Sequence, residues 1–233
     1  MKKQGNWIVF CLLVCMIVLL AAYWGSWAVT TMVENTPIDR AHTIIIDAGH
    51  GGEDGGASSA DGILESRYNL EIALRLEELF HFLGMETNMI RNTDISVYTE
   101  GETLAQKKRS DLKERVRRVN EAKNGLLLSI HQNSFPDSQY HGAQVFFAGT
   151  EGSQVLANAL QTALNRSLNS QSNRNSKKAE GIYLMEHIQA PGVLIECGFL
   201  TNPAESRNLR KPECQKKLCG IIATTVCEYL SNN

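Results

Sequence analysis

Several features that mark other protein classes are missing from this sequence. The cysteines show no CxxC spacing, which excludes a structural zinc finger on pattern, and there is no internal repeat or low-complexity segment. Basic residues are not in excess, because 23 Lys and Arg stand against 25 Asp and Glu. Two of the basic residues, Lys2 and Lys3, precede the main body, and the main body therefore carries a net negative charge. This charge argues against nucleic acid as a partner.

Charge is also absent from the N-terminal segment between Lys3 and Glu34. Trp7–Tyr23 is an apolar run, and about 17–25 apolar residues can cross a bilayer as a helix. With two lysines before the run, we expect residues 1–33 to be a cytoplasmic stub and an uncleaved membrane anchor, with the rest of the chain outside. A cleaved signal peptide is the alternative, because residues 26–28 form a weak cleavage site.

The remaining chain predicts a short linker over residues 34–41 and one catalytic domain over 42–233. Its apolar, β-branched runs alternate with segments of helical spacing, as in an α/β domain. We expect one mostly parallel or mixed sheet of about six strands flanked by helices, and a polar flap over residues 92–110. The expected strands are residues 43–47, 86–91, 126–131, 143–147, 182–185 and 193–197, and the expected helices are 65–83, 111–122, 153–168 and 214–230.

One carboxylate stands out, that of Glu196, which ends the apolar run Val193–Ile195. A carboxylate carried on an apolar strand is costly to bury unless a cation or a reaction needs it there. His50 follows an expected strand and His131 ends another, and sites in open α/β sheets form beyond such strand ends. We therefore expect these side chains to meet.

Two imidazoles and one carboxylate, those of His50, His131 and Glu65, match the three protein ligands of catalytic zinc. Taken singly, His50 fits a glycine turn, His131 fits a hydrogen-bonded histidine at a strand end, and Glu65 fits the start of a helix. Each lies at a junction between a loop and a strand or helix, and the three together favour a metal site. Glu196 is then a general base that moves a proton, with a structural ion pair as the alternative. Should Glu65 not be the third ligand, Asp54 is the next candidate.

Residues beside these candidates receive smaller roles. Gln132 and Asn133 are candidates to hydrogen-bond substrate, although Asn near a strand end is more often part of a turn. Strand alternation directs Cys197 away from Glu196. We expect the four cysteines of the domain to be free thiols.

Four ordered motifs resemble the zinc-dependent N-acetylmuramoyl-L-alanine amidases that cut peptidoglycan. They are residues 46–57, Glu65, residues 129–134 and residues 194–203, and the resemblance spans about Ile44 to Leu230. It implies a zinc ion held by His50, Glu65 and His131, with Glu196 catalytic. Gln132 stands where many members carry Ala, and Cys197 where many carry Val or Thr.

The single anchor, the absence of wall-binding repeats and the stretch Glu180–Met185 are similar to the germination-specific amidases of spore-forming bacteria. That resemblance implies removal of peptides from muramic acid in the spore cortex, the first step toward muramic-δ-lactam, outside the cytoplasm. It also favours an activating partner protein. The alternatives are a glycosidase that uses Glu65 and Glu196, and an inactive, membrane-tethered wall-binding protein.

Overall fold

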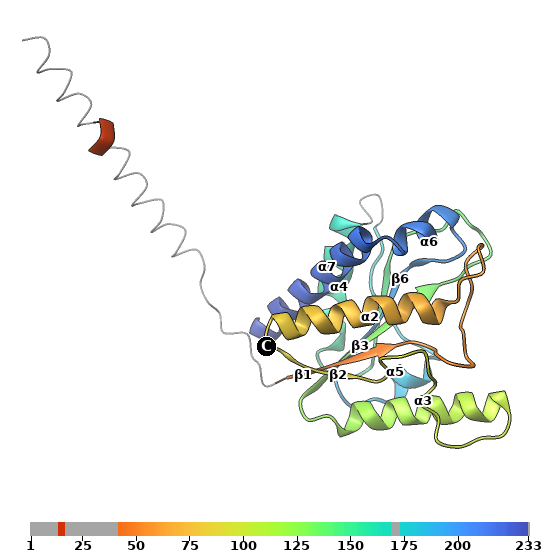
Figure 1. Ribbon diagram of the computed structural model, residues 1–233. Coiled ribbons are helices and arrows are strands. Elements are labelled where there is room, and N and C mark those ends of the chain that lie inside the picture. Colours follow the sequence, from red (N-terminus) through yellow and green to blue (C-terminus); the bar gives the residue numbers. More distant parts are fainter. Residues whose placement is uncertain (1–13, 17–41, 169–172, 233) are drawn as a thin grey trace, which may run out of the picture. The chain divides into compact units, whose positions relative to one another are not determined.

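The computed structural model describes residues 14–16, 42–168 and 173–232 (Figure 1). The chain divides into two compact units, Met1–Pro37 and Ile38–Asn233, and nearly all described residues belong to the second. The anchor predicted over residues 1–33 lies almost wholly outside the described residues, and the linker over 34–41 lies entirely outside them. Among the helices of the described part, none has the length and apolar character needed to cross a bilayer.

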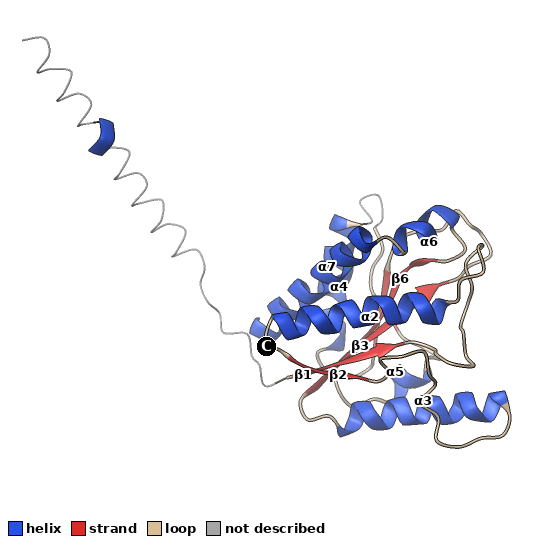
Figure 2. Ribbon diagram, in the orientation of Figure 1, coloured by secondary structure: helices blue, strands red, loops and turns tan. Residues whose placement is uncertain are grey.

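Six strands form one mixed sheet in the order β2-β1-β3-β6-β4-β5. Figure 2 shows the strands in red. The first four neighbours run parallel, while β4 pairs antiparallel with β6 and parallel with β5. This confirms the predicted mixed α/β sheet. The strands are β1 (Thr43–Ala48), β2 (Glu86–Met89), β3 (Gly125–Asn133), β4 (Gln144–Phe147), β5 (Lys177–Lys178) and β6 (Gly192–Phe199).

Helices cover both faces of the sheet (Figure 1). Strand alternation turns Ile44 and Ile46 toward a core shared with α2, α4 and α7, while Ile45 packs in a second core with α3 and α5. The sheet is therefore a buried middle layer. The helices are α2 (Glu65–Phe82), α3 (Leu104–Glu121), α4 (Ser153–Ser167), α5 (Tyr183–His187), α6 (Pro203–Leu209) and α7 (Pro212–Asn232).

Two sequence predictions about local structure were wrong. Residues 182–185 were expected as a strand, but residues 183–185 open α5, Ile182 is its N-cap, and the sixth strand is β5 instead. The predicted flap over residues 92–110 is partly helix, because α3 begins at Leu104 behind a capping box formed by Thr103 and Gln106. The part before the helix is tethered, since the Val97 amide donates to Asp111 and the Thr99 amide to Ser110.

The parallel order places three strand ends at one edge of the sheet. Ala48 of β1 lies opposite Ile130 of β3, and His131 of β3 lies opposite Glu196 of β6. The candidate residues that follow or end these strands are thereby brought to a common edge, as the sequence predicted.

Candidate metal and catalytic site

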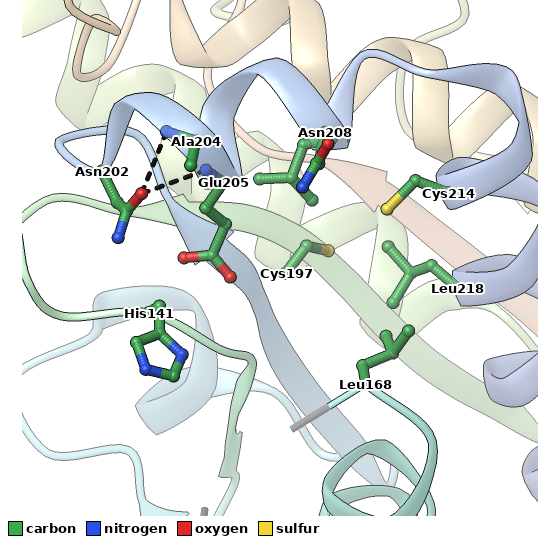
Figure 3. A pocket seen from close by; sticks show the side chains of 10 residues that line it. His141, Leu168, Cys197, Asn202, Ala204, Glu205, Asn208, Cys214 and Leu218 are labelled. Atoms are coloured by element: carbon green, nitrogen blue, oxygen red, sulfur yellow. Dashed lines mark hydrogen bonds between the residues drawn. The ribbon is translucent and has the colours of Figure 1, made fainter. Parts of the chain in front are cut away.

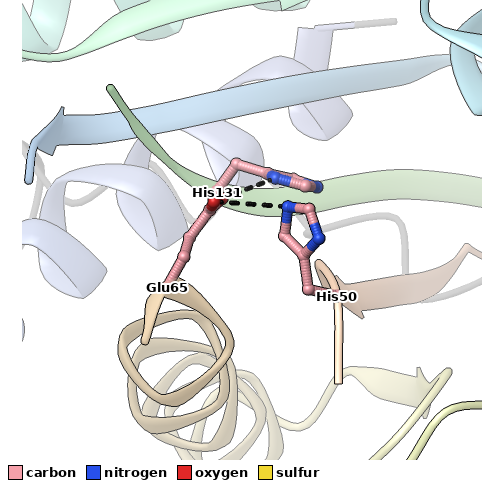
Figure 4. Close-up of side chains that lie close together, drawn as sticks. All are labelled: His50, Glu65 and His131. Carbon is pink, nitrogen blue, oxygen red and sulfur yellow. Dashed lines mark hydrogen bonds and ion pairs between the residues drawn. The ribbon is translucent and has the colours of Figure 1, made fainter. Parts of the chain in front are cut away.

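His50, Glu65 and His131 converge at this edge (Figure 4). The His50 Nε2 atom lies 3.3 Å from Glu65 Oε2, and the His131 Nδ1 atom lies 2.9 Å from Glu65 Oε1. One ligand atom from each residue lies within 4.8 Å of the other two. Tetrahedral zinc with ordinary bond lengths separates its ligand atoms by roughly 3.3–3.6 Å. The spacing and chemistry of this donor set therefore fit a zinc ion.

Glycine makes the close approach of these side chains feasible. A Cβ atom at Gly49 would lie 2.1 Å from His131 Nε2, and one at Gly56 would lie 2.5 Å from Glu65 Oε2. Both distances are far shorter than van der Waals contact, so any larger residue would displace a ligand. Gly49 and Gly56 are thus required for the close approach of these side chains.

Asp54 orients the first histidine. Its Oδ2 atom accepts a hydrogen bond from His50 Nδ1 at 3.0 Å, which leaves Nε2 directed toward Glu65. Burial would lower the pKa of His50, but the hydrogen bonds to Glu65 and Asp54 outweigh it and raise the pKa. A carboxylate behind a ligating imidazole is a common supporting arrangement in metal sites.

Glu65 opens α2 and is 4% exposed. Its Oε2 atom accepts from the Ala57 amide at 3.0 Å, and its Oε1 atom accepts from the Gln132 amide at 3.1 Å. Burial would raise the pKa of Glu65, but hydrogen bonds from His131 and His50 lower it far below the usual range. The side chain is therefore held as an anion, the form that binds a metal.

Glu196 faces the same cavity, of about 220 Å³, as His50 and His131. Residues of α3 and α5 form its walls, among them Leu112 and Leu184. The Glu196 Oε2 atom is buried and has no hydrogen-bond partner among the described residues. Burial raises the pKa of Glu196 to about 7. A carboxyl group with this pKa can accept and return a proton near neutral pH.

The next residue along β6 belongs to a different cavity, of about 400 Å³ (Figure 3). Cys197 lines it together with Glu205 and Cys214, so Cys197 points away from Glu196 as strand alternation predicted. Burial raises the pKa of the Cys197 thiol well above its usual range. Cys197, Cys214, Cys219 and Cys227 are all free thiols.

The two predicted substrate-binding residues differ in placement. Gln132 is 3% exposed, does not line the cavity of Glu196, and donates from Nε2 to Asn69 Oδ1 at 3.2 Å. Its backbone amide donates to Glu65, and its hydrogen bond to substrate stays a prediction. Asn133 is half-buried at the end of β3, and its contact with substrate stays a prediction.

Sequence reasoning missed a buried polar group that lines the same cavity as Glu196. Arg115 of α3 forms an ion pair with Asp47 of β1, and the Ser129 hydroxyl donates to the same carboxylate at 2.7 Å. Arg115 and Asp47 are 3% and 1% exposed, respectively. The available signal was the position of Arg115, which shares the inward face of a charged helix with Leu112 and Val119.

Glu196→Gln should make the metal-free domain more stable than the parent at about pH 8 but not at about pH 4. The folded pKa of Glu196, about 7, lies above the ordinary value of 4.5, so folding favours the protonated form. The stability from this group is fully present below about pH 4.5 and is lost as the pH rises through about 7, by ~3 kcal/mol at most. Urea unfolding at the two pH values measures it. An equal difference at both would contradict the raised pKa.

Comparison with known proteins adds independent findings. Residues 44–228 match the family described as N-acetylmuramoyl-L-alanine amidase. The germination-specific N-acetylmuramoyl-L-alanine amidase of Bacillus subtilis (strain 168) is 33% identical over 240 residues, which cover 99% of this chain and 97% of that protein.

Solved structures agree with the sequence comparison. The CwlD amidase from Clostridioides difficile, solved in complex with the GerS lipoprotein, has a TM-score of 0.78 and 37% identity, covering 82% of this chain and 99% of that chain. An N-acetylmuramoyl-L-alanine amidase from Clostridium difficile 630 has a TM-score of 0.70 and 28% identity, covering 82% of this chain and 98% of that chain.

Proposed function

We propose that His50, Glu65 and His131 hold a zinc ion and that Glu196 moves the proton in catalysis, because this chain belongs to the N-acetylmuramoyl-L-alanine amidase family. The chain is a peptidoglycan hydrolase that cleaves the amide bond between N-acetylmuramic acid and L-alanine. The observation that carries the proposal is the convergence of three ligand atoms within 4.8 Å, beside a cavity that the Glu196 carboxylate also lines.

Each side chain has a separate task in this reaction. When bound, zinc lowers the pKa of water and polarises the scissile carbonyl. Glu196 accepts a proton from the attacking water and returns it to the departing alanine nitrogen. Asp54 keeps the His50 ring oriented, and the Ala57 and Gln132 amides hold the Glu65 carboxylate in place.

A glycosidase that uses Glu65 and Glu196 is poorly supported by this geometry. Both oxygens of Glu65 accept backbone hydrogen bonds and face the two imidazoles, and its pKa is strongly lowered. Neither a nucleophile nor a general acid is expected in such surroundings, because each needs an oxygen open to the sugar. The two histidines would also have no role.

The relatives support a proposal for the natural substrate. The Bacillus subtilis protein is named for germination and matches nearly the full chain, which supports peptidoglycan of the spore cortex as substrate and muramic-δ-lactam formation as the outcome. The CwlD structure holds a lipoprotein, which supports an activating partner of that kind for this chain.

Digestion of purified cortex peptidoglycan by the zinc-loaded domain tests this function. We expect free N-terminal alanine to appear with time, because the amide to muramic acid is the bond that breaks. Reducing sugar should stay at the level of an undigested sample. New reducing ends without free alanine would identify a glycosidase, and no product with the partner protein present would identify an inactive wall-binding protein.

We further propose that residues 1–33 anchor the domain at the outer face of the membrane. The support is the uncharged run between Lys3 and Glu34. Protease added to intact spheroplasts should therefore digest the domain, while a cytoplasmic control protein stays whole. Protection of the domain, or release of a mature chain that starts near Val29, would contradict the anchor.

A further inference from the structure

The segment that carries His50 is held by its backbone carbonyls. Each carbonyl of residues 48–51, here called the His50 loop, accepts a hydrogen bond from a side chain outside the loop. Arg91 donates to Ala48 O at 2.7 Å and to Gly49 O at 3.0 Å. Arg115 donates to Ala48 O at 3.2 Å and to His50 O at 2.8 Å, and the Ser96 hydroxyl donates to Gly51 O at 2.6 Å.

Burying the two arginines where they reach these carbonyls costs free energy. Arg91 and Arg115 are 2% and 3% exposed, and a buried guanidinium is unfavourable unless its donors find acceptors. Arg115 is paired with Asp47 and, at 2.6 Å, with Asp111. Neutralising two acids needs only a cation, whereas reaching two loop carbonyls as well needs the planar fork of arginine.

His50 itself needs such support. Its φ angle is +60°, in the left-handed region that residues other than glycine rarely adopt. Conformations of this kind persist only where the surroundings fix them. Arg115 bonds the carbonyl of His50 itself, and Arg91 bonds the carbonyl just before it, so the two arginines hold the peptide groups on both sides of the metal-ligating residue.

We propose that Arg115 is a positioning residue for His50, with Arg91 and Ser96 as its partners, and that it sets the zinc affinity of the site without being a zinc ligand. This inference rests on the zinc site proposed above. It assigns to α3 a role in metal binding in addition to forming a wall of the cavity. A purely structural Arg115, present only to neutralise Asp47, would affect folding but not the affinity of the folded domain for zinc.

Arg115→Lys in the otherwise intact chain separates these roles. Lysine keeps a cation beside Asp47 but cannot bond two loop carbonyls and Asp111 together. We expect zinc affinity, measured by competition with a chromophoric chelator, to fall about 10–100-fold, the usual effect of losing a supporting residue. Thermal melting and circular dichroism of the metal-free variant verify that it is folded.

Arg118→Lys is the matched control, on the same helix and with the same chemical change. Arg118 donates to Glu114 and to Ile90 O, outside the His50 loop, so its replacement should leave zinc affinity within about twofold of the parent. Ser96→Ala is a milder second variant that removes one loop hydrogen bond and no charge. It should weaken zinc binding roughly 2–10-fold.

The outcomes are distinct. Parental zinc affinity in folded Arg115→Lys would overturn the inference while leaving the zinc site intact. If Arg115→Lys does not fold, Ser96→Ala decides, and parental affinity there would overturn it equally. If the parent chain binds zinc no better than His50→Ala does, the zinc site and this inference both fail.

Discussion

Replacing Glu196 with glutamine is expected to lower turnover on peptidoglycan by about 10²–10⁴-fold, the usual contribution of a positioned proton-transfer group. Glutamine has the shape of glutamate but cannot accept a proton from water. Glu196 lies in the same cavity as His50 and His131 but outside the set of three ligand atoms. Its loss should therefore leave zinc content near one ion per chain.

Single-turnover release of free alanine, with zinc measured on the same sample, checks both parts of this result. Zinc lost in parallel with activity would make Glu196 a ligand. Turnover within a few-fold of the parent would mean that the proton acceptor lies elsewhere. Glu205→Gln is a suitable control, because Glu205 lies in the cavity on the other side of β6 and should not affect chemistry at the metal.

Glu65→Ala is expected to abolish zinc retention and, with it, nearly all activity. The variant leaves only two imidazoles, and catalytic zinc typically requires three protein ligands. It also frees the Ala57 and Gln132 amides that now donate to the carboxylate. Zinc content after dialysis, by atomic absorption, is the measurement.

Asp54→Asn provides the comparison for that result. Asp54 contacts His50 Nδ1 from outside the ligand set, so its replacement should weaken zinc binding about 10–100-fold without abolishing it. If Glu65→Ala kept full zinc occupancy while Asp54→Asn lost it, Asp54 would be the third ligand. That outcome would contradict the geometry described above.

The parts of the fold set by local pattern could be predicted from the sequence. The β-branched run Ile44–Ile46 forms a buried strand because such residues fit a sheet covered on both faces. The apolar spacing after Glu65 forms α2, and Gly84, with a φ of +74°, follows its end. The convergence of the candidate residues was predictable because parallel strands place their carboxyl ends at one edge.

Other features were not predicted from the sequence, for reasons that differ from one to the next. Residues 182–185 form a short apolar run, and such runs do not distinguish a strand from one turn of helix. The start of α3 was missed because the capping box at Thr103 was overlooked. The role of Arg115 depends on partners far away in the sequence, at Asp47 and in the His50 loop, so only the folded chain brings it to light.

Stepwise addition of zinc to the metal-free domain, with cortex peptidoglycan as substrate, tests the central claim most directly. Activity, read as free N-terminal alanine, should be absent without zinc and rise with added zinc until about one ion per chain is bound. His50→Ala should show no such rise over the same range. Full release of alanine by the metal-free domain, with chelator present throughout, would contradict the account.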